Sequence, residues 1–464
     1  MDFDHTLDAE RNRLMAEWAN TFDNSLLDIG VVAARYRKNP RCTLVSKHCG
    51  SFNFSLRLHW DDDGPDWLIR FPVLGKAIFA EEKYQNEVAV MRFIRQNTKI
   101  PIPEIIAHGA AAENPTGLGP FMIMTWLEGT TMKDLLEVRV PTPDGNSEGV
   151  LNPDIANVTL NPLYDGIARI LLDLWALNFD KIGSLGYDDV SNSWKVNRRP
   201  LTLGMNEFVR LGGIPEDDLK SGTFTSSLDY FFHSSELHKL HLEKQLNSIF
   251  DSRDCREKYT CRHLFRSMIP SFVSSKDING PFKLFCDDFG PGNILVNPST
   301  LEITGVIDWE FCYAAPAQFS ASPPSWLLLK RPDHWVQDDG LQHFLKHYTP
   351  KFDMLLSSLE THEAERGLSG ADEILSIRMR RSMEDRTIWF NLAVRNGWSI
   401  DFVYWNLLDN YIYGSASMTE RVAGQQAAAS YTVTERGSKA NIEYQEEEDI
   451  EKREYWLPPT ALVV

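Results

Sequence analysis

Two short apolar stretches, each followed closely by an acidic side chain, interrupt the second, mainly helical part of this chain. Residues 283–286 lead to Asp288, and residues 303–308 end on Asp308. Asn293 lies between them, five positions after Asp288 and fifteen before Asp308. Short apolar runs bounded by turn residues are typical of buried strands. Two such strands with polar residues at their ends predict a compact centre where these side chains meet on one face.

The first part of the chain has a different pattern, in which apolar residues alternate with polar ones. Such alternation predicts strands, and the sequence from Asp61 to Pro65 reads as a turn between two of them. Other apolar residues recur at helical spacing, for example Leu14, Trp18 and Phe22. We therefore expect helices over residues 8–36 and 79–96, and strands over 43–47, 52–60, 66–72 and 121–127.

Beyond residue 130 the pattern is mainly helical. Residues 138–160 contain Pro, Gly, Asn and Asp and read as a loop, while GSLG at 183–186 reads as the turn that ends a long helix. The acidic run at 446–449 is typical of a solvated tail. The helices are expected over 131–138, 161–179, 227–250, 254–267, 340–361, 371–395 and 399–413.

Acidic residues outnumber basic ones, 65 to 47, which gives a formal net charge of −18. A field of that sign repels nucleic-acid phosphates and anionic lipids, so neither nucleic acid nor a membrane is expected as a partner. The same field would favour a cationic substrate, although solubility alone explains it equally well. No stretch approaches the ~18 apolar residues that a membrane-spanning helix needs.

The six cysteines are scattered without a CxxC pair, which favours reduced thiols in an intracellular compartment. The first residues, MDFDHTLDAERNR, lack the basic and apolar segments of a signal peptide. We therefore expect a cytoplasmic protein. The sequence does not identify its protein partners.

The centre around residues 283–310 has the groups that phosphoryl transfer from ATP requires. That reaction needs an acceptor for the proton of the substrate hydroxyl and ligands for Mg²⁺. Magnesium prefers hard oxygen ligands and keeps several waters, so one carboxylate and one amide oxygen suffice. Asp288 suits the base, and Asn293 and Asp308 suit the metal. The plain alternative is that all three are turn or capping residues, which their spacing between two apolar strands disfavours.

This segment resembles the protein-kinase-like superfamily, in its aminoglycoside phosphotransferase and choline kinase branch. The catalytic loop of that branch reads His-x-Asp-x-x-x-x-Asn, and residues 286–293 read Cys-Asp-Asp-Phe-Gly-Pro-Gly-Asn. The branch's metal motif is usually Ile-Asp-Trp-Glu, which stands here at 307–310. Roughly residues 40–415 are similar to the large fungal set of such phosphotransferase-like proteins. The resemblance implies an α+β, bilobal fold: a five-stranded antiparallel N-lobe with one main helix, and a larger helical C-lobe.

The resemblance also implies roles in the N-lobe. The turn from Gly50 to Asn53 resembles the phosphate-covering turn of the family, where glycine lets backbone amides approach the nucleotide. Arg70 stands where kinases place a lysine that touches the α- and β-phosphates, and Glu87 where relatives place the partner of that lysine. The plain alternatives are an ordinary turn and two surface charges.

Residues 121–129, FMIMTWLEG, resemble the hinge of the family. The backbone between Met124 and Trp126 would then hydrogen-bond adenine, although a simple buried strand is compatible with the same pattern. ATP and Mg²⁺ are thus the cofactors that the resemblance implies. ATP would bind between the two lobes.

Three positions depart from the family pattern. Cys286 replaces a histidine that mainly organises the loop in relatives, and Asp287 replaces a glycine common in the aminoglycoside enzymes. Arg70 in place of lysine exchanges a point charge for a planar fork, which is not a conservative change, although arginine also binds phosphate well. These departures leave open a catalytically weak pseudokinase that senses nucleotide or acts as a scaffold. A protein kinase is disfavoured, because no Ala-Pro-Glu signature follows Asp308.

A group of histidines and cysteines in the second part of the chain suggests another reading. Soft ligands in such number are typical of zinc sites. Their spacings match no closed structural site, so packing within helices is favoured over zinc. The residues are His233, His238, His241, Cys255, Cys261 and His263.

The sequence therefore predicts a phosphotransferase that moves the γ-phosphate of ATP to a hydroxyl of a small molecule. Amino alcohols, sugars, aminoglycoside-like molecules and secondary metabolites all stay open as acceptors, because fold and motif do not fix the substrate. The predicted organisation is a helical extension (1–40), a nucleotide-binding N-lobe (41–129), a catalytic and acceptor-binding C-lobe (130–415) and an acidic tail (416–464).

Overall fold

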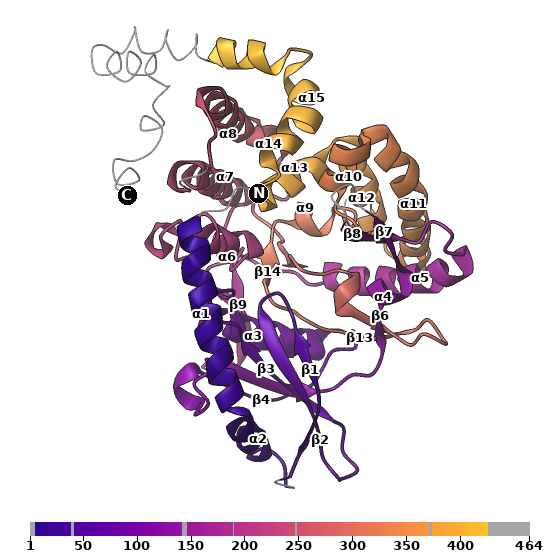
Figure 1. The fold of residues 1–464 in the computed structure, drawn as a ribbon. Coiled ribbons are helices and arrows are strands. Elements are labelled where there is room, and N and C mark those ends of the chain that lie inside the picture. Colours follow the sequence, from indigo (N-terminus) through magenta and orange to yellow (C-terminus); the bar gives the residue numbers. More distant parts are fainter. Residues whose placement is uncertain are drawn as a thin grey trace.

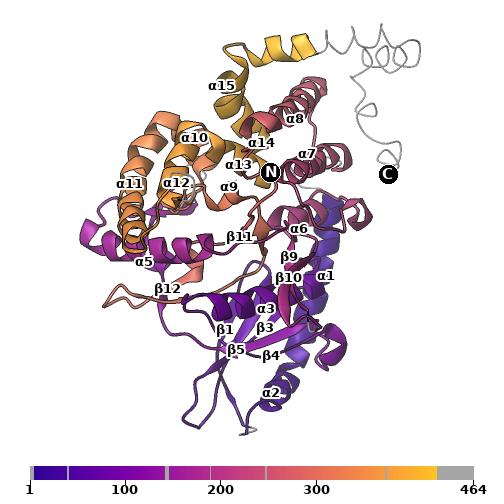
Figure 2. The ribbon, with the colours of Figure 1, turned by 180° about the vertical axis from the view of Figure 1, so that it is seen from behind.

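The computed structural model describes residues 5–38, 41–141, 146–188, 190–245, 248–370 and 374–425. Figures 1 and 2 show a lobe built around one sheet and a larger, mainly helical lobe. The sheet has five antiparallel strands in the order β1-β2-β3-β5-β4. Its strands are β1 (Thr43–Cys49), β2 (Asn53–His59), β3 (Trp67–Pro72), β4 (Ile105–Gly109) and β5 (Phe121–Thr125).

Helices cover both faces of this sheet, because its central strands carry apolar side chains on both sides. Ile69 and Ile123 pack with α1 (His5–Asn24) and α2 (Leu26–Ala34) on one face. Met122 and Met124 pack with α3 (Ala80–Asn97) on the other. The sheet therefore forms a layer with α1 and α2 on one face and α3 on the other. The helix α3 lies on the face toward the second lobe.

The single helix predicted over residues 8–36 is two helices, α1 and α2. The helix is interrupted at Ser25, whose hydroxyl donates to the carbonyl oxygens of Thr21 at 2.7 Å and Thr116 at 3.0 Å. The second bond ties the break to the loop before β5. A periodic apolar pattern continues through such a break, so the sequence did not reveal it.

The second lobe is built around the long helices α5 (Asn157–Trp175) and α11 (Leu341–Glu365), which lie side by side. Ile167 and Leu355 are fully buried in the core that these helices share. The remaining helices are α4 (Met132–Leu136), α6 (Leu203–Arg210), α7 (Ser227–Lys244), α8 (Ser252–Phe272), α9 (Ala317–Ser320), α10 (Pro332–Asp339), α12 (Leu375–Glu384), α13 (Thr387–Arg395), α14 (Ile400–Val403) and α15 (Asp409–Tyr413). The remaining strands are β6 (Thr130–Thr131), β7 (Glu137–Pro141), β8 (Ser147–Leu151), β9 (Ser184–Asp188), β10 (Ser193–Arg198), β11 (Lys283–Cys286), β12 (Ile294–Val296), β13 (Ile303–Val306) and β14 (Cys312–Ala315).

The strands predicted at residues 283–286 and 303–308 correspond to β11 and β13, but they do not pair with each other. β11 pairs with β14, whereas β13 pairs with β12, which in turn pairs with β6. Two neighbouring small sheets result. The loop from β11 to β12 and the turn from β13 to β14 both cross from one small sheet to the other, so their residues lie close together.

Three predicted elements of the second lobe were wrong. Residues 138–160 are not only a loop, because β7 and β8 form a hairpin there. GSLG does not end a helix but leads into β9, which pairs with β10. Residues 371–395 hold two helices: residues 371–373 lie outside the described part, and Arg386, with φ of 63°, separates α12 from α13. The first two errors come from strand pairing, and the third from a left-handed residue, neither of which apolar periodicity registers.

The predicted α+β, two-lobed fold is confirmed, with its antiparallel sheet first and its helical lobe second. Among the helices that the structure describes, none combines the length and the apolar character needed to span a bilayer. The predicted boundaries of the extension, the lobes and the tail stay predictions. Most of the predicted tail, residues 426–464, lies outside the described part of the chain.

The core around α5 makes a direct prediction. Replacing Ile167, fully buried, by alanine should lower the free energy of unfolding by about 2–5 kcal/mol, because a cavity remains where the side chain was. Leu27→Ala, at a side chain that is 87% exposed, serves as the control and should change it little. Denaturant unfolding of both variants checks this, and equal effects would contradict the packing described.

Candidate active site

Arg70 lies in the middle of the sheet and reaches toward α3. Its backbone is fixed between two strands, opposite Ser55 of β2 and Met122 of β5. Its guanidinium forms an ion pair with Glu87, and its Nη1 lies 3.0 Å from Asp308 Oδ1. The side chains of Arg70 and Glu87 are 7% and 0% exposed. The structure thus brings together three residues that the sequence singled out, from the sheet, from α3 and from the second lobe.

The turn that carries Asp308 is strained. Asp308 and Phe311 both adopt left-handed backbone conformations, with φ of 61° and 53°. Aspartate tolerates this region, but for a bulky residue it is a genuine outlier. Trp309 is buried between them, and its Nε1 donates to the Val306 carbonyl oxygen at 3.2 Å. Such strain persists only where the surroundings hold it in place, and it is concentrated at functional sites.

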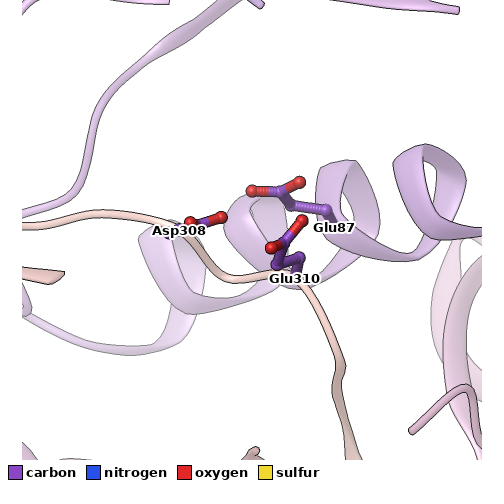
Figure 3. A group of neighbouring side chains, drawn as sticks. All are labelled: Glu87, Asp308 and Glu310. Carbon is purple, nitrogen blue, oxygen red and sulfur yellow. The ribbon is translucent and has the colours of Figure 1, made fainter. Parts of the chain in front are cut away.

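Three carboxylates meet at this turn. Figure 3 shows Glu87, Asp308 and Glu310 pointing toward one another, the first from α3 and the others from the turn after β13. One carboxylate oxygen from each of the three lies within 4.8 Å of the other two. Arg70 and Lys83 oppose these carboxylates, so ionised groups would leave one negative charge in excess. Glu87 and Glu310 are each paired with a buried cation, which leaves Asp308 as the candidate hard oxygen ligand for a divalent cation such as Mg²⁺.

The partial burial of Asp308, whose side chain is 25% exposed, shapes the electrostatics of this cluster. Burial raises the pKa of Asp308 well above its usual range, the charge of Glu310 adds to the rise, and Arg70 opposes it. A bound cation would favour the ionised form of such a carboxyl.

Asp288 and Asn293 lie at the two ends of one short loop. Asn293 Nδ2 donates to the carbonyl oxygen of Asp288 at 2.9 Å and to its Oδ2 at 3.2 Å. The N–H of Ile307 donates to the Asn293 carbonyl oxygen at 2.9 Å, which binds this loop to the residue before Asp308. Asp288, Asn293 and Asp308 therefore lie in adjacent, hydrogen-bonded segments, and their chemical roles stay predictions.

The surroundings of Asp288 change its acidity. Burial raises its pKa to about 6, and the charges of Glu310 and Asp287 act in the same direction. The hydrogen bond from Asn293 and the charge of Lys83 act in the opposite direction. A carboxyl of this pKa is ionised at neutral pH and accepts a proton more readily than an ordinary aspartate.

Cys286 and Asp287 hold the loop on its other side. Cys286 is buried opposite Cys312 in the β11–β14 ladder, and its thiol donates to the Glu310 carbonyl oxygen at 3.4 Å. Asp287 Oδ2 accepts the backbone N–H of Leu203, at the start of α6, at 3.1 Å. Arg395 of α13 lies 3.6 Å from Asp287 Oδ1. The two departures from the family motif therefore connect the loop to its neighbours.

The predicted phosphate-covering turn is a tight connection between β1 and β2. The Gly50 N–H donates to the Asn53 carbonyl oxygen at 2.8 Å. The Asn53 side chain is buried and faces the interior, where Nδ2 donates to Glu310 Oε2 at 2.9 Å and Oδ1 accepts from Lys83 at 2.7 Å. The Asn53 side chain is thus bonded within the protein, and nucleotide binding by the backbone of this turn stays a prediction.

The predicted hinge lies where β5 leaves the sheet. Met124 is buried and lies opposite Leu68 of β3 and Ile105 of β4. The Trp126 N–H donates to the Asp66 carbonyl oxygen at 2.8 Å. The Trp126 amide therefore continues the contact with the β3 side of the sheet, and adenine binding by the backbone of residues 124–126 stays a prediction.

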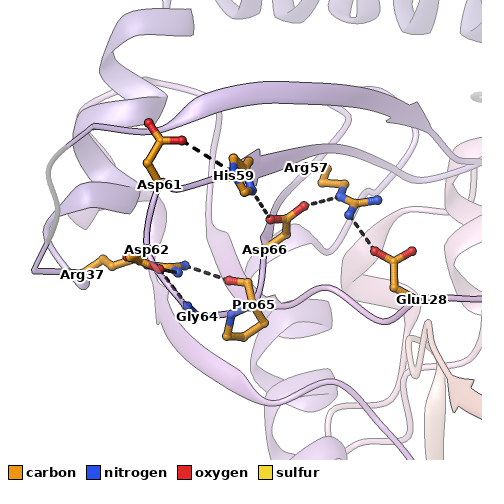
Figure 4. A network of polar contacts seen from close by, with 9 residues as sticks. All are labelled: Arg37, Arg57, His59, Asp61, Asp62, Gly64, Pro65, Asp66 and Glu128. Atoms are coloured by element: carbon orange, nitrogen blue, oxygen red, sulfur yellow. Dashed lines mark hydrogen bonds and ion pairs between the residues drawn. The ribbon is translucent and has the colours of Figure 1, made fainter.

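A polar network joins this hinge to the hairpin between β2 and β3 (Figure 4). Arg57 donates to Asp66 Oδ2 and to Glu128 Oε1, both at 2.6 Å, and its guanidinium lies 4.5 Å from the centroid of the Trp126 ring. His59 Nδ1 lies 2.7 Å from Asp66 Oδ1. These contacts fix the direction in which the chain leaves the first lobe. The sequence did not reveal them, because their partners come from separate segments.

The histidine and cysteine group of the second lobe packs within helices. His238 is buried, and its Nε2 lies 2.9 Å from the Val394 carbonyl oxygen. Burial lowers the pKa of His238 to about 3 and of His241 to about 4. Among the residues that the structure describes, this group does not converge on a common point as the three carboxylates do.

Lys83 and Glu310 are the residues of this site that the sequence reasoning missed. Glu310 lay inside the recognised Ile-Asp-Trp-Glu motif, and Lys83 stands one helical turn before Glu87 on α3. That spacing places Lys83 and Glu87 on one face of the helix. This four-residue spacing could have pointed to Lys83, although no local pattern predicts that a lysine is buried at that position.

No protein-family model matches this chain. It is 36% identical over 331 residues to the protein named "Altered inheritance of mitochondria protein 9, mitochondrial" of Yarrowia lipolytica, covering 67% of this chain and 54% of that protein. It is 24% identical over 279 residues to clavilactone A biosynthesis cluster protein Y of Ampulloclitocybe clavipes, covering 57% and 60%. The chain spans between 24% and 60% of the length of the curated relatives that it matches.

Among solved structures, the chain is similar to a thermostable mutant of aminoglycoside phosphotransferase APH(4)-Ia in ternary complex with AMP-PNP and hygromycin B. That likeness covers 81% of this chain and 98% of the other at 14% identity, with a TM-score of 0.41. The fold is evident from this chain's own sheet order, its α3 ion pair and its helical second lobe. The chain has a two-lobed, protein-kinase-like α+β fold, and the two fungal proteins are its homologues.

Proposed function

We propose that this protein is an ATP- and Mg²⁺-dependent phosphotransferase that moves the γ-phosphate of ATP to a hydroxyl of a small molecule. The observation that carries the proposal is the contact of Arg70 with both Glu87 and Asp308. Through this contact, Arg70 of the sheet is joined to Glu87 of α3 and to the candidate metal ligand Asp308, which lies beside the loop that carries Asp288. The proposed roles follow from that arrangement.

Asp288 would accept the proton of the substrate hydroxyl. Its carboxylate lies beside Asn293, which holds it by a hydrogen bond and leaves the amide oxygen as a hard ligand. Asn293 and Asp308 would hold Mg²⁺, which supplies charge neutralisation at the phosphates. Arg70, positioned by Glu87, would contact phosphate oxygens. Each group acts mainly by position and charge, as transfer through a loose transition state requires.

The acceptor stays open. A cavity of about 90 Å³ lies beside the loop and is lined by Asp287, Phe289 and Trp326 among others. It is smaller than typical drug-sized ligand pockets, which are about 300–1,000 Å³. This supports a small acceptor, or an opening of the second lobe when a larger one binds. The acidic charge excess of the chain is compatible with a cationic acceptor.

A second candidate function is a nucleotide-binding regulatory or scaffolding module with little catalysis. The observation that favours it is the same Arg70–Asp308 contact, because a carboxylate bound to arginine is less available to a metal. MgATP binding without transfer to any acceptor would support this candidate. We keep the cytoplasm as the proposed location, while the Yarrowia lipolytica relative carries the word mitochondrial in its name.

Binding of Mg²⁺ and ATP provides the first test. Together they should raise the melting temperature more than either alone, because a ligand that binds only the folded state stabilises it, by about 2.7 kcal/mol at a hundredfold excess over its dissociation constant. Thermal unfolding with Mg²⁺, with ATP and with both measures this. No shift at millimolar MgATP would contradict both the enzyme and the nucleotide-binding module.

Two conservative variants separate the base from the metal ligand. Asp288→Asn should reduce turnover by ~10²–10⁴, the usual contribution of a general base, and leave MgATP affinity nearly intact. Asp308→Asn should reduce both, because it removes a charge from the metal site. Calorimetric binding and steady-state kinetics against a panel of hydroxylated amines and sugars measure this. Equal losses of MgATP affinity would refute the division of roles.

The acidity of Asp288 predicts a pH dependence of stability. Its folded pKa of about 6 lies above the ordinary value near 4, so the folded state binds its proton more tightly. Its ionisation therefore destabilises the fold above about pH 6, and this penalty disappears as the pH falls toward 4. Asp288→Asn should raise the melting temperature at neutral pH, with a gain that shrinks toward about pH 5.

The groups that face Asp288 are Glu310, Asp287, Lys83 and Asn293, so its titration belongs to this cluster. Asp217→Asn, at an exposed position, is the matched control and should show no such gain. Differential scanning calorimetry of the nucleotide-free proteins across this pH range measures the melting temperatures. A gain for Asp288→Asn that is independent of pH would contradict the raised pKa.

A further inference from the structure

Lys83 is a buried lysine for which the proposed chemistry has no role. It projects from α3 one turn before Glu87, and its side chain is 1% exposed. Its ammonium group forms an ion pair with Glu310 and donates to Asn53 Oδ1 at 2.7 Å. Asn53 Nδ2 donates to Glu310 Oε2 at 2.9 Å. The three side chains therefore form a closed triangle in which each touches the other two.

The corners of this triangle belong to three parts of the proposed nucleotide site. Asn53 ends the turn that would cover the phosphates, and Glu310 lies two residues after the candidate metal ligand Asp308. Lys83 shares α3 with Glu87, which holds Arg70. A single ammonium group thus connects the covering turn, the metal-binding turn and the helix between them.

Aromatic contacts close the same gap beside the triangle. Phe52, in the covering turn, lies edge-on to Phe311 with ring centroids 5.2 Å apart. The Phe52 carbonyl oxygen accepts the Val73 N–H at 2.8 Å, which holds the turn to the end of β3. The Lys83 ammonium lies 6.0 Å from the Phe311 ring centroid. Residues 50–53 and 308–311 are therefore held together by polar and apolar contacts at once.

The charges explain why a lysine is needed at this point. Arg70 is already shared between Glu87 and Asp308. Glu310 is 2% exposed, so without Lys83 its carboxylate would have no comparable cation and would repel Asp308. A buried charge that loses its partner disturbs its surroundings strongly.

We propose that Lys83 is a positioning residue that closes the turn of residues 50–53 over the metal-binding segment of residues 308–311, and so sets the affinity for magnesium-bound nucleotide. It acts through Asn53 and Glu310 and touches neither phosphate nor metal. This inference rests on the proposed function for its effect on nucleotide binding. Its structural part, the closure of the turn, holds independently of any reaction.

The test compares Lys83→Met with Arg262→Met. Arg262 of α8 is also a buried cation, 5% exposed, and forms an ion pair with Asp401 far from the site in the sequence and in the fold. Both variants should lose stability. Only Lys83→Met should weaken MgATP binding, by about tenfold or more in calorimetry, and Lys83→Arg should recover part of that loss because the charge persists.

Hydrogen exchange of the nucleotide-free proteins tests the closure itself. Amides of residues 50–54 and 308–312 should exchange faster in Lys83→Met and be unchanged in Arg262→Met, since local opening is reported by exchange. Asn53→Ala, which keeps the ion pair, should speed exchange in residues 50–54 and provides the test if Lys83→Met does not fold. Unchanged exchange there in the folded variants, or equal MgATP affinity in Lys83→Met and the unmodified protein, would overturn the proposal.

Different results would refute the proposed function and the positioning role of Lys83. If the unmodified protein binds no MgATP, the proposed function is refuted, while the exchange comparison still decides whether Lys83 closes the turn. If the unmodified protein binds MgATP and Lys83→Met binds it equally well, the proposed function stands and the positioning role is refuted.

Discussion

Arg70 extends from the middle of the sheet to Glu87 on α3 and to Asp308 in the second lobe. Burying such charges costs several kcal/mol per ion unless each has a partner of good geometry. The backbone of β3, the axis of α3 and the turn after β13 must therefore keep the positions that satisfy this contact. The relative placement of the two lobes around the site depends on it, because an apolar contact would tolerate small shifts that a buried ion pair does not.

The turn at Asp308 holds the carboxylate of the second lobe in the position that the contact with Arg70 requires. Two left-handed residues, Asp308 and Phe311, bracket the buried Trp309. The energy of this conformation is offset by the contacts of Glu310 with Lys83 and Asn53 and by the small sheets on both sides. The site therefore combines backbone strain with a dense set of charges, and both are features that a fold retains mainly where chemistry needs them.

The departures at the catalytic loop fit the same architecture. Cys286 stands where relatives carry a histidine, and its thiol still reaches the Glu310 backbone. Asp287 accepts the N–H of Leu203 at the start of α6 and lies beside Arg395. These two residues connect the loop to the turn after β13 and to α6 and α13. A different set of side chains thus holds the loop without removing Asp288 or Asn293 from it.

The sequence by itself determined β1, β2, β3 and β5 of the first lobe and the positions of Asp288, Asn293 and Asp308, because alternation and spacing are local properties. It missed β4, β12 and β14, which are short apolar runs that periodicity cannot distinguish from helix. Only the tertiary structure decided the contacts of Arg70 with Asp308, of Lys83 with Glu310 and of Asn53 with Glu310. Their partners are 238, 227 and 257 positions apart, and charge pairing over such separations follows from how the lobes pack rather than from any local pattern.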